Sequence, residues 1–163
     1  MEKFGKSQPV KRVEDVRFLT GQGQYVDDIA PDGALHAFVF RSAVAHAEIV
    51  ALDLEEARAA DGVHLILTVG DLQAAGVKTA MPATILDNRD GTPAAAPKRH
   101  VLAKDRVRFV GEPVAVVFAE TLIQARDAAE LIDLDYDDLP AKIDVAAGGQ
   151  VIHAEAPENR AFD

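Results

Sequence analysis

Apolar and polar positions in the middle of the chain follow an order that predicts a strand, a helix and a second strand. Residues 49–53 form the first strand, residues 54–60 a short helix and residues 63–69 the second strand. Asp53 is placed to cap the helix, and Gly62 can end it because glycine enters the left-handed conformation without a Cβ penalty. This stretch therefore predicts one strand-helix-strand unit.

A second stretch further along the chain has the same order. Residues 113–119 are uniformly apolar, Thr121 can cap a helix that runs to about residue 130, and residues 132–136 alternate between apolar and polar. Apolar side chains recur at helical spacing in this helix, so one face can bury against a sheet, and its alanines allow close approach. These apolar positions are Leu122, Ala125, Ala129 and Ile132. The two stretches differ in length and share no fixed motif, which indicates common architecture and not an internal repeat.

The segments outside these two units predict an arm, a strand, a loop and a tail. Residues 11–20 predict one short helical turn that stops at Gly21, and residues 35–40 predict a buried strand. Residues 76–98 contain prolines and a turn cluster without a sustained period, so we expect a long surface loop that a neighbouring module covers. Residues 146–163 have no periodicity and no closing element, as if the chain were cut there.

Together these patterns predict an α+β fold with a mixed sheet, two strand-helix-strand units and a long surface loop. We expect a docking arm and loop over residues 1–33, the α/β domain over residues 34–145, and a C-terminal tail over residues 146–163. A length of 163 residues fits one compact domain.

Charge and composition exclude several classes of function. The chain has 27 acidic and 17 basic residues, and this net charge of −10 argues against broad binding to nucleic acid or anionic membranes, since both need surplus lysine and arginine. It has no cysteine, so disulfides, thiolate catalysis and iron–sulfur ligation by this chain are excluded. The first residues lack an apolar signal core, and no uncharged run approaches the roughly 18 residues of a membrane span. We therefore expect a soluble, cytoplasmic protein.

Two short motifs imitate known sites, but each lacks residues that its chemistry requires. Gly21-Gln22-Gly23 begins like a dinucleotide-binding loop, but the third glycine would fall at Val26. His46-Ala47-Glu48 matches half of the nucleobase-deaminase signature, which also needs downstream cysteines to hold zinc. Neither motif predicts a functional site.

Aspartate, histidine and serine residues likewise form no convincing site. Four aspartates imitate a calcium loop, but Asp138 stands where the sharp turn needs glycine, and Pro140 interrupts the loop. No second type of metal ligand accompanies the histidines at a suitable spacing, and neither serine lies in a nucleophile elbow. The residues concerned are Asp133, Asp135, Asp137, Asp144, His36, His64, His100, Ser7 and Ser42.

Glu112, in Val110-Gly111-Glu112-Pro113, is the one carboxylate at the mouth of a predicted buried strand. Burial could raise the pKa of such a group toward acid–base use. A turn explains the same residues, since Gly111 supplies backbone freedom and Pro113 fixes the entry into the strand. We expect a structural role for Glu112; the alternative is a small enzyme centred on it, for which the sequence offers no partner acid or base.

A longer motif gives the chain a family resemblance. Residues 12–29, RVEDVRFLTGQGQYVDDI, closely resemble the opening of the large, molybdenum-cofactor-binding subunit of the xanthine dehydrogenase, aldehyde oxidase and carbon monoxide dehydrogenase family. The chain departs from the family pattern at Ala43-Val44, where Pro-His is usual, and at Asp61-Gly62-Val63, where Pro-Gly-Val is usual. The resemblance continues in order through residues 35–37, 41–42, 45–49, 71–72, 110–115, 128–132 and 135–140.

The resemblance implies both a fold and a place in an enzyme. In that family this stretch is the α/β hammerhead domain, the first module of the large subunit, which implies the hammerhead fold for residues 34–145. The implied holoenzyme is a molybdenum-dependent oxidoreductase that hydroxylates aldehydes, N-heterocycles or similar small substrates with water as the oxygen source. It would carry a molybdopterin cofactor in the complete subunit, and iron–sulfur clusters and FAD on partner subunits.

The family's catalytic glutamate, cofactor-binding loops and pocket residues belong to modules beyond Asp163. We therefore expect no catalytic, cofactor-binding or metal-binding residue in this chain, and no activity from the chain alone. Its expected partners are the remaining domains of the molybdenum-binding subunit and the iron–sulfur and flavin subunits. The alternative is a free-standing, non-enzymatic interaction or ligand-binding module that retains the hammerhead fold.

Overall fold

The computed structural model describes residues 11–81 and 86–163, which form two compact units, one ending at Ala34 and one starting at Leu35. Ser7 and Pro82 lie outside the described residues, as do residues 1–10 of the predicted docking arm. In the described part, no helix is long and apolar enough to cross a membrane.

The first unit contains two short helical segments, α1 (Asp15–Leu19) and the 3-10 turn η1 (Val26–Asp28). The Phe18 and Tyr25 rings stack with their centroids 5.6 Å apart. A Cβ atom at position 23 would overlap the Phe18 ring, so a larger residue there would need the ring to shift. The predicted helical turn over residues 11–20 is confirmed, and Gly21 follows it with a φ of 73°.

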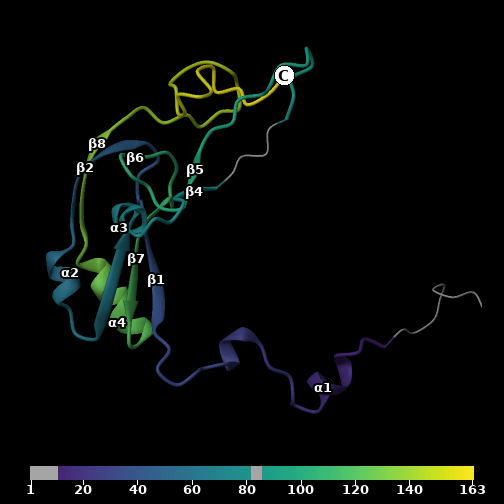
Figure 1. Cartoon of the computed structure of the whole chain (residues 1–163), viewed down its shortest axis with the longest axis vertical. Helices are drawn as coiled ribbons and strands as arrows, with labels where there is room; N and C mark the ends of the chain where they lie inside the picture. Colours follow the sequence, from purple (N-terminus) through teal and green to yellow (C-terminus); the bar gives the residue numbers. More distant parts are fainter. Residues whose placement is uncertain (1–10, 82–85) are drawn as a thin grey trace, which may run out of the picture. The chain divides into compact units, whose positions relative to one another are not determined.

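The described residues of the second unit form two three-stranded sheets and one two-stranded sheet (Figure 1). The first has the order β1-β7-β3, the second the order β6-β2-β8, and the third pairs β4 with β5. The strands are β1 (His36–Arg41), β2 (Ala47–Asp53), β3 (Val63–Thr68), β4 (Ala80–Met81), β5 (Arg99–His100), β6 (Arg106–Val107), β7 (Pro113–Ala119) and β8 (Asp133–Asp138).

Three helices accompany these sheets: α2 (Glu55–Ala59), α3 (Val69–Ala74) and α4 (Leu122–Glu130). Helix α4 packs against β1, β7 and β3, and α2 packs against β3 and α4. The predicted cap at Thr121 is confirmed, since its Oγ1 accepts the N–H of Gln124 at 3.2 Å. The predicted cap at Asp53 is wrong: Leu54 is the N-cap residue of α2, although Asp53 Oδ1 accepts the N–H of Glu55 at 2.9 Å.

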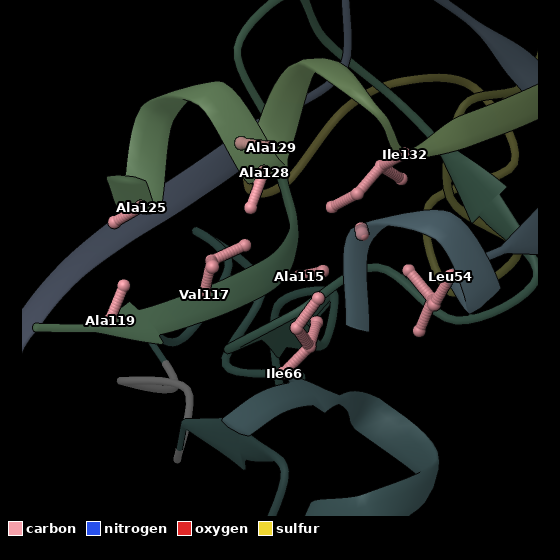
Figure 2. Packing of buried hydrophobic residues seen from close by; sticks show 10 residues of the cluster. Leu54, Ile66, Ala115, Val117, Ala119, Ala125, Ala128, Ala129 and Ile132 are labelled. Carbon is pink, nitrogen blue, oxygen red and sulfur yellow. The ribbon is translucent and has the colours of Figure 1, made fainter. Parts of the chain in front are cut away.

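Small side chains let α4 lie close to the central strand. Figure 2 shows Ala125 and Ala128 of α4 facing Ala119 and Val117 of β7. All four side chains are completely buried. The predicted buried face is confirmed at Ala125, Ala129 and Ile132 but is wrong at Leu122, which is 40% exposed. Ala128 is buried instead, since it lies three residues after Ala125 and so shares the helix face that meets the sheet.

The prediction of a mixed sheet is wrong, because every strand pair among the described residues is antiparallel. The elements of both strand-helix-strand stretches occur in the expected order, but the two strands of each stretch join different sheets. Strand β2 pairs with β8, while β3 pairs with β7. The connection over residues 54–62 is shorter than the roughly twelve residues that a parallel crossover needs.

Three further details differ from the sequence-based expectations. Strand β1 is at most half-buried, because it lies at the edge of its sheet, so the expectation of a buried strand over residues 35–40 is wrong. Val69 begins α3 and does not end β3. Sequence analysis missed α3, although Thr68 and Asp71 form a capping box at its start.

The predicted long loop is closed at its base by β4 and β5, and Asp87 and Pro93 form an isolated bridge within it. Residues 146–163 contain no helix or strand, but side-chain hydrogen bonds from Asn159 hold them together. Asn159 Nδ2 donates to Gly148 O and Gln150 O, and its Oδ1 accepts the N–H of Ile152. The tail is therefore a compact coil.

Candidate functional site

Glu112 lies in the turn that leads from β6 into β7, as the sequence predicts. Its side chain is buried, and its Oε2 accepts the backbone N–H of Arg108. The backbone pairs with Ser42 on both sides, because Ser42 N donates to Glu112 O at 2.9 Å and Gly111 N donates to Ser42 O at 2.8 Å. Gly111 has a φ of 85°, a conformation that favours glycine. The carboxylate thus closes the turn between residues 108 and 112.

The Ser42 hydroxyl is also engaged in structure. It donates to Val44 O at 2.9 Å and accepts the N–H of Val44 at 3.1 Å. The Tyr136 hydroxyl donates to it at 3.4 Å, which ties β8 to this turn. A serine nucleophile needs a base within hydrogen-bonding distance of its hydroxyl, and no histidine among the described residues bonds to Ser42. Ser42 and Glu112 therefore share a structural network without an acid–base pair.

The histidines singled out in the sequence are dispersed. His36 and His64 are exposed, and His64 Nε2 lies 3.5 Å from Glu120 Oε1. His46 is buried, and its Nδ1 is 2.9 Å from Pro140 O, whereas its Nε2 has no hydrogen-bond partner within the described residues. His100 Nδ1 is also buried without such a partner.

The acidic positions do not assemble into a site either. Glu48 of the His-Ala-Glu motif pairs with Arg106 at 2.5 Å, on the side of β2 that carries β6. Asp133, Asp135 and Asp137 lie exposed along β8, at the edge of its sheet. Across residues 11–81 and 86–163, no three histidine or acidic side chains come together in a way that could hold a metal ion.

A polar hollow is the feature that sequence analysis missed. It has a volume of about 350 Å³ and is lined by Arg108, Lys142, Asp144 and His153, among others. Burial, followed by the charge of Arg108, lowers the pKa of His153. Lys142 Nζ lies 2.5 Å from Asp144 Oδ1, and this contact lowers the pKa of Asp144. The tail has no periodicity, so no sequence pattern places His153 beside Arg108.

The comparison with protein families decides the assignment. Residues 20–140 match the family model described as "Aldehyde oxidase and xanthine dehydrogenase, a/b hammerhead domain". The chain belongs to this hammerhead family. The match includes both three-stranded sheets and all the helices of the second unit, and the expected family resemblance is thereby confirmed.

The hammerhead chain is similar to curated proteins named as the large subunit or large chain of an enzyme. It is 41% identical over 155 residues to the nicotine 6-hydroxylase large subunit of Paenarthrobacter nicotinovorans, covering 92% of this chain and 18% of that protein. It is 39% identical over 134 residues to the carbon monoxide dehydrogenase large chain of Afipia carboxidovorans, covering 82% of this chain and 15% of that one.

A solved structure agrees with the sequence matches. Quinoline 2-oxidoreductase from Pseudomonas putida 86 has a TM-score of 0.72 and 38% identity to the hammerhead chain, with 86% of this chain and 16% of that chain covered. The chain thus spans less than one-fifth of the length of these relatives.

Proposed function

We propose that this hammerhead chain is the first, structural module of a molybdenum hydroxylase large subunit. The holoenzyme would hydroxylate or oxidise aldehydes, N-heterocycles or similar small substrates with water as the oxygen source. The observation that carries the proposal is the family match over residues 20–140 in a chain that spans under one-fifth of its relatives. The relatives named for nicotine and quinoline favour a heterocyclic substrate.

In this proposal the reaction belongs to other modules and not to the described residues. They bring no metal-ligating cluster together, and Glu112 is bonded to the backbone of its own turn. We therefore assign no molybdopterin cofactor to these residues. The cofactor would lie in the remainder of the large subunit, with iron–sulfur clusters and FAD on partner subunits.

The role of the chain would be to pack against the cofactor-binding modules. The arm over residues 11–29 exposes apolar side chains, of which Val13 is 95% and Leu19 87% exposed. Because exposed apolar side chains are stabilised by burial at an interface, the arm and the loop over residues 76–98 are our proposed contact surfaces. The predicted boundaries at residues 33 and 145 and the cytoplasmic localisation remain predictions from the sequence.

Three measurements test this function: molybdenum content, dye reduction and co-purification. The chain alone should contain no stoichiometric molybdenum and should not reduce a dye with an aldehyde as donor. When it is co-expressed with a nicotine 6-hydroxylase large subunit that lacks its matching segment, the two should co-purify. Stoichiometric molybdenum in the chain alone would overturn the proposal.

The second candidate is a free-standing interaction or ligand-binding module with the hammerhead fold. It predicts that the chain is encoded away from molybdenum-enzyme genes and does not co-purify with the truncated relative. Val13→Ser and Leu19→Ser variants sharpen the distinction, because they should weaken co-purification only if the arm is a contact surface.

A further inference from the structure

A hollow on the second unit is lined by charged side chains that have no part in the proposed packing against cofactor-binding modules. It lies between the segment around β6, the loop after β8 and the C-terminal coil. Its polar lining is formed by Arg108, Lys142, Asp144, His153 and Asn159. Its volume of about 350 Å³ is enough for a small ion or for a side chain from another molecule.

Arg108 is the group whose bonding is incomplete. Its Nη1 donates to Arg106 O at 3.1 Å, and its backbone N–H is used by Glu112. Its Nε is buried and has no hydrogen-bond partner within the described residues. A buried N–H group of a charged guanidinium is costly to leave unbonded, and an oxyanion is the acceptor that matches its geometry best.

Among the described residues, the other charged side chains of the lining make no hydrogen bond or ion pair with Arg108. Lys142 brings a second positive charge, and its side chain is only 13% exposed. Asp144 is the one acidic residue in the lining, and it is 68% exposed. Its Oδ1 accepts a hydrogen bond from Lys142 Nζ and another from the N–H of Ala146 at 3.2 Å. This oxygen therefore has its partners without Arg108.

His153 responds to the positive potential of this region. Burial lowers its pKa first, and the charges of Arg108, His100 and His46 lower it further, whereas Glu155 raises it. An anion seated beside Arg108 would act in the opposite direction and favour the imidazolium. Asn159 has a supporting role, since its side chain is bonded to the backbone of the coil that carries His153.

We propose that this hollow is an oxyanion site, in which the Arg108 guanidinium binds a carboxylate or phosphate group beside the Lys142–Asp144 ion pair, and His153 adds positive charge when it is protonated. The overall charge of −10 repels anions at long range, so binding depends on these short-range contacts. The group can belong to a free anion or to an acidic side chain of another protein. The site is independent of the role in a molybdenum enzyme.

The test is a titration of the full chain with inorganic phosphate and, separately, with acetate, followed by the NMR signals of His153. We expect saturation at about 10 mM or below and a rise in the pKa of His153 when the anion is bound. Lowering the pH should tighten binding as His153 becomes protonated. The charged groups that face His153 are Arg108, Lys142, Asp144 and Glu155, and the neighbouring titratable groups are His46 and His100.

Three variants assign the effect to the hollow. Arg108→Gln should weaken binding by about tenfold or more, whereas Arg58→Gln, at an exposed position of α2, should leave it unchanged. Lys142→Gln should weaken binding by a smaller factor, and it keeps the test valid if Arg108→Gln does not fold.

The sources of the anion can be separated by the probes. Binding of phosphate or acetate alone supports a free-anion site, whereas binding only of a peptide that carries glutamate side chains supports an acidic segment of a partner protein. The proposal is overturned if none of these probes saturates the folded wild-type chain, or if Arg108→Gln and Lys142→Gln bind as tightly as wild type.

Discussion

The β1-β7-β3 sheet with α4 and the coil over residues 146–163 are held together by different kinds of contact. In the sheet, completely buried apolar side chains such as Val117, Ala119 and Ala128 meet across a short distance. In the coil, one side chain, Asn159, makes three hydrogen bonds to backbone groups. Many residues share the apolar burial of the sheet region, whereas few side-chain hydrogen bonds hold the coil. Single substitutions should therefore affect the two regions very differently.

The largest effect is expected in the core of the sheet. Ile66 is 2% exposed, and Ile66→Ala should lower the free energy of unfolding by about 3 kcal/mol, because it removes buried methyl groups and leaves a cavity. Denaturant unfolding followed by circular dichroism measures this. Leu65→Ala is the matched control: Leu65 is 48% exposed, and its substitution should cost much less. Equal losses in the two variants would contradict the assignment of the core.

A smaller loss is expected at the turn that leads into the central strand. Glu112→Gln keeps the shape of the side chain but removes the charge from its hydrogen bond to Arg108 N–H, which should lower the free energy of unfolding by about 1.5 kcal/mol. Glu120→Gln, at an exposed carboxylate, should change it very little. If any oxidoreductase activity of the chain fell while the stability stayed constant, the structural role of Glu112 would be refuted.

A local effect without a global one is expected in the coil. Asn159→Ala removes the hydrogen bonds to Gly148, Gln150 and Ile152, so residues 146–163 should exchange their amide hydrogens faster. The midpoint of global unfolding should stay nearly unchanged, because the core of the sheet is intact. Hydrogen exchange measured by mass spectrometry reports both regions at once. A matching acceleration in β7 would show that the two regions unfold together.

The smallest effect concerns the dependence of stability on pH. The folded pKa of His153 is lowered, chiefly by burial, so the folded protein binds fewer protons than the unfolded chain in mildly acidic solution. The contribution of His153 is complete above its unfolded pKa of about 6.5 and decreases as the pH falls toward the lowered folded value. His153→Gln should remove this acid-dependent loss in denaturant titrations at several pH values. His64→Gln, at an exposed histidine, should not.

The sequence predicted the elements of the sheet region well because each depends on neighbours along the chain. The apolar run over residues 113–119, the cap at Thr121 and the alanines of α4 are all local patterns. The arm motif over residues 12–29, with the segments that follow it, was enough to identify the family. That this chain carries no metal-binding or catalytic residue remains a prediction from the sequence.

By itself, then, the sequence determined where the longer strands and α2 and α4 form, most of the buried face of α4 and which family the chain resembles, since periodicity and motifs are properties of adjacent residues. Only the tertiary structure decided that β2 pairs with β8 and β3 with β7, because strand pairing depends on long-range packing that a period of two does not encode. It also placed His153 and Arg108 in the lining of one hollow, since hydrogen bonds of Asn159 and of the backbone, among them Ala95 N to Ala161 O, fold an aperiodic tail into place.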